Sequence, residues 1–176
     1  MRIIRLLLLV ALGLTLPAGA ATPSADLQKC QKTLHGKVRS FVNVTHTALL
    51  GCAQKVEECK LAQEIDGASP TMCLAAASVS CGAATGKIAT LRGTSAGKAT
   101  GACGLIPIGD LNAFISGLGF FNVSGTCAAT NASDLVTCVF DDAQCAAERT
   151  VFKLDPRAQN SLTAGGIAAS FPCVAP

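Results

Sequence analysis

Ten cysteines are the residues of this sequence whose number and reactivity are best suited to chemistry. They are Cys30, Cys52, Cys59, Cys73, Cys81, Cys103, Cys127, Cys138, Cys145 and Cys173. Structural zinc sites separate paired ligands by two to four residues, covalent haem needs C-x-x-C-H, and thiol–disulfide exchange needs C-x-x-C. None of these spacings occurs among the ten cysteines. We therefore expect no metal ligands and no cofactor.

The two histidines and one pair of acids are the other candidates for catalysis. His35 and His46 share one face of a helix, but they lie about 16 Å apart along its axis, which is too far to bind one ion. Two histidines on a helix surface do not by themselves build a Ser-His-Asp arrangement. Asp141 and Asp142 are explained by capping of a helix that starts there. We expect no catalytic residues.

The first twenty residues have the organisation of a secretory signal peptide. Arg2 and Arg5 form a basic region, an apolar run follows to Leu16, and residues 18–20 supply the small side chains of a signal peptidase site. The run is shorter than the roughly 20 residues of a spanning helix, and no later segment is expected to span a membrane. An exported chain meets an oxidising compartment, periplasmic or extracellular, where an even number of cysteines predicts disulfides.

Two long helices are predicted for the first half of the mature chain. Apolar or small residues recur with helical spacing from Asp26 to Lys60, and this stretch contains no proline. The sequence DGASP at residues 66–70 is a turn signal that ends with a proline suited to open a helix. Residues 71–103 are then rich in alanine, as one helix or as two pieces broken near residues 82–86.

The spacing of the first six cysteines predicts that these two helices form an antiparallel hairpin. Facing residues of such a hairpin have numbers with a nearly constant sum, and one nested pairing gives sums of 132 or 133. That pairing joins Cys59 to Cys73, Cys52 to Cys81 and Cys30 to Cys103. Helix axes 8 to 10 Å apart bring facing Cα atoms within disulfide range. The neighbouring glycines are expected to permit this approach: Gly51, Gly82, Gly101 and Gly104.

Residues 105–176 are predicted to form short helices and loops, packed on residues 21–104 as one domain. One helix is expected to end at Phe140, and another to run from Asp141 to about Leu154. Two pairings of the remaining cysteines stay open. They are Cys138–Cys145 with Cys127–Cys173, or Cys127–Cys138 with Cys145–Cys173. The predicted fold class is all-α: a long antiparallel helical hairpin stapled by nested disulfides, with a smaller cysteine-bearing helical segment.

Several short motifs resemble a loosely defined group of uncharacterised exported, Ala-rich and Cys-rich helical proteins of environmental bacteria. The motifs are Cys30-Gln31-Lys32, Cys52, Lys87-Ile88-Ala89 before Cys103-Gly104, Leu118-Gly119-Phe120, and Pro156-Arg157-Ala158. The resemblance covers most of the mature chain and implies export and a helical fold. It implies no activity and no site residues.

The sequence favours a secreted, non-catalytic structural or protein-interaction module. Its mature part carries twelve basic and eleven acidic residues once Arg2 and Arg5 are removed, so nothing points to nucleic acid. The expected partner is an unknown protein or a cell-surface component. One alternative is a small-molecule or lipid binding protein with an apolar pocket lined by Phe114, Phe120 and Phe121. A small secreted hydrolase is the third possibility.

Overall fold

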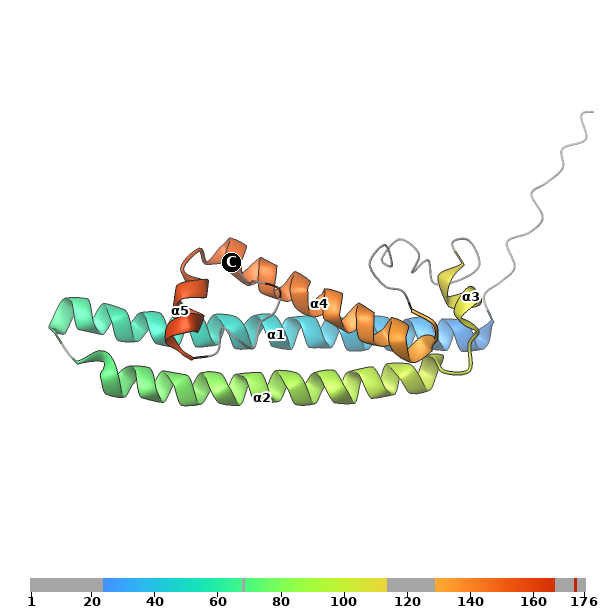
Figure 1. The fold of residues 1–176 in the computed structure, drawn as a ribbon, viewed down its shortest axis with the longest axis horizontal. Coiled ribbons are helices and arrows are strands. Elements are labelled where there is room, and N and C mark those ends of the chain that lie inside the picture. The colour runs from blue at the N-terminus through green and yellow to red at the C-terminus, as the bar shows by residue number, and fades with distance from the viewer. Residues whose placement is uncertain (1–23, 68, 114–128, 167–172, 174–176) are drawn as a thin grey trace, which may run out of the picture.

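The computed structural model describes residues 24–67, 69–113, 129–166 and 173, and these residues are all-α. The helices are α1 (Ala25–Asp66), α2 (Pro70–Cys103), α3 (Ile108–Asn112), α4 (Ala132–Leu154) and α5 (Ala158–Ala164). Figure 1 shows α1 and α2 side by side along their length, running in opposite directions. The predicted all-α class and the long antiparallel hairpin are confirmed.

Local signals in the sequence set where the two arms of the hairpin begin and end. Ser24 caps α1, because its hydroxyl accepts a hydrogen bond from the backbone N–H of Leu27 at 3.2 Å. Gly67 ends α1 in the left-handed region with φ 62°, and its N–H donates to the carbonyl of Gln63. Pro70 then opens α2, as predicted.

The second arm is one continuous helix of 34 residues, without a break at residues 82–86. Each glycine in a helix interior costs about 1 kcal/mol relative to alanine, so α2 alone would be a poor helix. Packing along α1 offsets that cost, since helices in proteins take most of their stability from tertiary contacts.

Three nested disulfides join the arms, in the predicted pairing. The Cα–Cα distances are 4.8 Å for Cys30–Cys103, 5.2 Å for Cys52–Cys81 and 5.6 Å for Cys59–Cys73. All three fall within the 4.4–6.8 Å that a disulfide requires. The hairpin is therefore cross-linked near its open end, in its turn-side half and next to its turn.

The glycines near these bridges do not have the predicted role. A Cβ added at Gly51, Gly82 or Gly101 would meet no heavy atom within 4 Å outside its own helix. At Gly104 the Cβ would approach the carbonyl of Thr100, in the same arm and not across the hairpin. The small buried residues of the two arms are instead Ala53, Ala77 and Ala99, together with five of the six bridging cysteines.

The helix α4 also differs from the prediction, because it is one helix of 23 residues and not two. Asn131 caps it, and its side chain accepts from the N–H of Asp134 at 3.0 Å. Asp141 and Asp142 are exposed in the middle of α4, where Asp141 forms an ion pair with Arg92 of α2. A tertiary partner, and not a helix start, therefore accounts for one of these two acids.

The core lies between the hairpin and the C-terminal helices. α4 packs on α1 and α2, and α5 packs on α1. Phe41 and Phe140 are fully buried and their rings meet at 5.4 Å between centroids. Gly165, at the end of α5, sits so close to the Cys52–Cys81 bridge that a Cβ there would lie 3.3 Å from the Cys81 Sγ.

One helix in the part of the chain that the structure describes, residues 71–103, is long and apolar enough to cross a membrane by length and composition. This was not expected from the sequence. Only 17% of its most apolar window is buried. Three disulfides bind α2 to α1, so a spanning α2 would have to carry the charged side chains of α1 with it, at a high free-energy cost.

Candidate functional site

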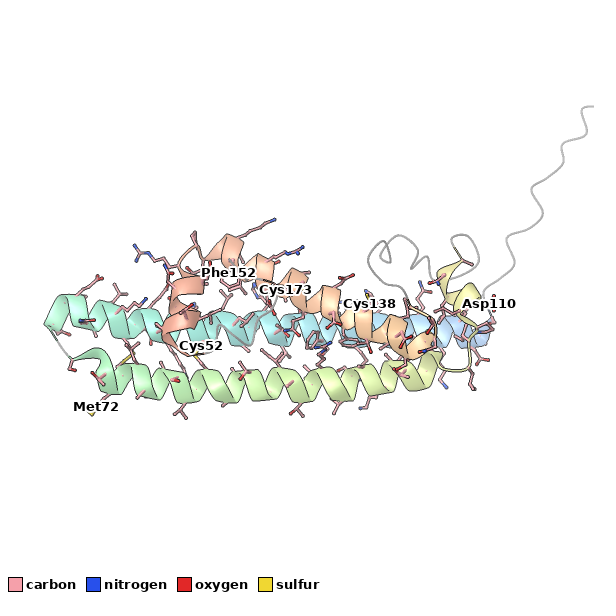
Figure 2. The ribbon with its side chains drawn as sticks, in the orientation of Figure 1. Cys52, Met72, Asp110, Cys138, Phe152 and Cys173 are labelled. Atoms are coloured by element: carbon pink, nitrogen blue, oxygen red, sulfur yellow. A yellow bond between two sulfur atoms is a disulfide. The ribbon has the colours of Figure 1, made fainter. Side chains whose placement is uncertain are left out.

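The turn end of the hairpin carries most of the exposed large apolar side chains in the described residues. Six such side chains are exposed: Leu61, Ile65, Met72, Val79, Leu105 and Leu154. The first four belong to the last turns of α1 and the first turns of α2. We call residues 55–79 the tip. Figure 1 shows the turn end of the hairpin extending past α5, and Figure 2 shows Met72 pointing away from α1.

Within each arm, the exposed apolar residues of the tip share a face. Leu61 and Ile65 are four residues apart, and Met72 and Val79 are seven apart, spacings that return to nearly the same side of a helix. Ile65, Met72 and Val79 are 78%, 86% and 76% exposed. The Cys59–Cys73 bridge holds the two arms together at this point. Because the arms are cross-linked here, the apolar face of each arm is presented on a rigid frame.

Acidic residues outnumber basic residues in the α1 part of the tip. The α1 part of the tip contains four acids, Glu57, Glu58, Glu64 and Asp66, against the two bases Lys55 and Lys60. The α2 part contributes no charge, since its first charged residue is Lys87. The tip is thus apolar and acidic, which favours a partner with apolar and basic groups.

One C-terminal bridge distinguishes between the two pairings left open. Cys145 is joined to Cys173, with a Cα–Cα distance of 5.0 Å. This excludes the pairing of Cys138 with Cys145. Cys138 is itself disulfide-bonded, and Cys127 lies outside the described residues.

A buried carboxyl group stands beside the Cys145–Cys173 bridge and has no signal in the sequence. Glu148 is fully buried in α4. Its Oε1 accepts from the Gln144 Nε2 at 2.8 Å, and its Oε2 accepts from the backbone N–H of Cys173 at 3.2 Å. Burial raises the pKa of Glu148, although these two hydrogen bonds oppose the rise. The carboxyl group helps to hold Cys173 against α4.

The histidines are not gathered into a catalytic arrangement in the described residues. His35 is exposed, and the Nε2 of His46 is buried without a hydrogen-bond partner. One pattern was missed in the sequence: Gly93–Gly97 reads GTSAG, which matches the G-x-S-x-G motif of serine hydrolases. That motif acts at a strand-to-helix turn, whereas Ser95 lies within α2 and is 3% exposed. The match therefore does not support a nucleophile.

A groove of about 430 Å³ lies between α1 and α4. Its apolar wall consists of Leu34, Val38, Val42 and Val139, and its polar lining includes His35 and Arg39. We call this the α1–α4 groove. The predicted pocket residues Phe114, Phe120 and Phe121 lie outside the described residues. No group of three or more metal-ligating side chains occurs within the described residues of the hairpin and the C-terminal helices.

Comparisons with protein-family models, with curated proteins and with solved structures gave no match. The resemblance to exported Cys-rich helical proteins therefore stays a prediction. Any function proposed for the chain rests on its own geometry.

Proposed function

We propose that the mature chain is a secreted, non-catalytic rod that presents its tip to a protein partner. One observation carries this proposal: the exposed apolar side chains gather at a projecting, cross-linked end of the hairpin. Contiguous exposed apolar surface, rimmed by polar residues, marks interaction sites in soluble proteins. A rigid frame also lowers the entropy lost on binding.

Export is part of the same proposal. Four disulfides among the described residues are compatible with an oxidising compartment outside the cytoplasm. We propose that residues 1–20 are removed during export. Mass spectrometry of the protein from its native source should then find Ala21 at the N-terminus, and an intact Met1 would contradict the signal peptide.

Site-specific photocrosslinking tests the role of the tip. A photoreactive residue at position 72 should capture a partner in the native compartment, because Met72 is the most exposed of the large apolar side chains of the tip. The matched control is position 97, which is also exposed on α2 but away from the tip. Adding Ile65→Asp should abolish capture at position 72. Equal capture at positions 72 and 97 would contradict the proposal.

The α1–α4 groove supports a second function, the binding of a small apolar molecule. Its volume of about 430 Å³ lies within the range of 300 to 1,000 Å³ that is common for ligand pockets. Native mass spectrometry of the secreted protein should then show a co-purified ligand that Val38→Glu removes. Purified protein free of any small molecule, with no binding of long-chain carboxylates added to it, would contradict this function.

A further inference from the structure

We propose that a second copy of this chain docks its tip into the α1–α4 groove, so that copies associate head to tail. This inference rests on the proposed function, because it names the partner of the tip. The observation behind it is a match between two distant surfaces of one molecule. The tip is apolar and acidic, whereas the groove is apolar and lies in the basic part of α1.

The groove offers what an exposed apolar side chain of the tip needs. Leu34 and Val139 are nearly buried and form its floor, while Val38 and Val42 are half-buried and still accessible. A side chain such as Met72 or Ile65 would cover these apolar groups and lose its own contact with water. Removal of apolar surface from water on both partners is the main favourable contribution to association.

The charges near the groove complement those of the tip. The first turns of α1 carry four bases, Lys29, Lys32, Lys37 and Arg39, against the single acid Asp26. Arg39 lines the groove itself. α4 contributes two acids near the groove: Asp134, which is hydrogen-bonded by Thr130 and Asn131, and the exposed Asp142, three residues after Val139. They offset only part of the basic charge of α1. Opposite charges on exposed surfaces raise the association rate and are weakened by salt.

Intramolecular docking is excluded by the length of α1. Leu34 in the groove and Ile65 in the tip are 31 residues apart on one helix. At 1.5 Å per residue they are about 46 Å apart, and the disulfides prevent the hairpin from folding back. The tip can therefore reach only the groove of another molecule. In the head-to-tail arrangement each dimer uses one tip and one groove, which leaves a free tip and a free groove at its ends.

Two blocked variants of the purified mature protein, with disulfides intact, test this arrangement. The tip-blocked variant carries Ile65→Asp and Met72→Asp, and the groove-blocked variant carries His35→Glu and Arg39→Glu. All four residues are exposed, so the fold should persist, which circular dichroism checks. Lys98→Glu is the control, since it is an exposed charge reversal outside both surfaces.

Sedimentation velocity gives the readout. The wild-type mass should rise with protein concentration beyond that of a dimer and fall as salt is added. Each blocked variant should show a dissociation constant at least tenfold higher, and Lys98→Glu should not. Mixing the two blocked variants should restore association but stop at a one-to-one dimer, because only one competent tip and one competent groove remain.

Three results would overturn the head-to-tail contact: a wild-type protein that is monomeric at every concentration, blocked variants that associate like the wild type, or a mixture that fails to form dimers. If the wild type is monomeric while position 72 still captures a different protein, only this inference fails. If position 72 also captures nothing, the proposed function fails with it.

Discussion

At the scale of single residues, Glu148 is expected to make stability depend on pH. Burial raises its pKa above the ordinary value of 4.5, so the folded chain keeps a proton that the unfolded chain has already lost. By linkage, the contribution of Glu148 to the free energy of unfolding is largest below about pH 4.5 and falls as the pH rises through the folded pKa. Glu148→Gln should remove this fall, as measured by urea unfolding at a series of pH values.

The test of this prediction is how the free energy of unfolding changes with pH, and not its absolute value. The amide introduced by Glu148→Gln has one acceptor oxygen and cannot accept from both Gln144 and Cys173, so the variant should also lose about 1–3 kcal/mol at every pH. Glu58→Gln is the control, because Glu58 is exposed and should leave the slope unchanged. If the free energy of unfolding changed with pH in the same way for the wild type and Glu148→Gln, the prediction would be wrong.

A second residue-scale prediction compares two glycines in opposite surroundings. A Cβ at Gly165 would lie 3.3 Å from both the Cys81 Sγ and the Val56 Cγ2, and both atoms are held in the core. Gly165→Ala should therefore destabilise the fold by about 1 kcal/mol or more through overpacking. Gly97→Ala should stabilise it by about 0.5–1 kcal/mol, because that Cβ meets nothing within 4 Å and alanine favours the helix.

Urea unfolding of the two alanine variants decides between these expectations. The backbone φ at Gly165 is −74°, so no strain from a positive φ adds to the crowding there. If both variants changed the free energy of unfolding by the same amount in the same direction, the crowding at Gly165 would be relieved at no cost.

At the scale of elements, the nested disulfides are expected to contribute unequally. The outer bridge, Cys30–Cys103, has a sequence separation of 73 and the middle bridge one of 29. With the middle bridge in place, the outer bridge therefore closes a loop of 73 − 29 = 44 residues, whereas Cys59–Cys73 closes a loop of only 14. Loop-closure entropy predicts a loss of about 4 kcal/mol without the outer bridge and about 3 kcal/mol without the innermost one. The measurement is urea unfolding of the variants Cys30→Ala with Cys103→Ala and Cys59→Ala with Cys73→Ala.

Alanine is the suitable replacement because Cys30 is fully buried and a serine hydroxyl there would lack a partner. A larger loss at the innermost bridge would mean that strain or packing, and not chain entropy, sets the order.

At the scale of the whole molecule, the hairpin should make the monomer elongated. The 42 residues of α1 extend about 63 Å, so a rod of that length has a radius of gyration of at least about 18 Å. A compact domain of similar size would have about 15 Å. Small-angle scattering at low protein concentration should give the larger value. A radius near about 15 Å would contradict an extended hairpin.

Much of the hairpin could be predicted because its signals are local or strictly spaced. Ser24, Gly67 and Pro70 act on the backbone within one or two turns, so their effects are visible without the fold. Cysteine spacing predicted the nested bridges, since an antiparallel pair of helices keeps one register along its length. The same reasoning failed at Asp141, because its partner Arg92 is 49 residues away in the sequence and no local signal reveals it.

The sequence alone determined that this chain is helical, that its arms are antiparallel and which cysteines join them. These properties follow from the helical periodicity of apolar residues and from the spacing of the cysteines, both of which can be read along the sequence. Only the tertiary structure decided that Cys145 pairs with Cys173, that Glu148 is buried beside them, and that the apolar residues of the tip stay uncovered. Burial and exposure depend on how α4 and α5 pack on the hairpin, and contacts between distant segments have no period in the sequence.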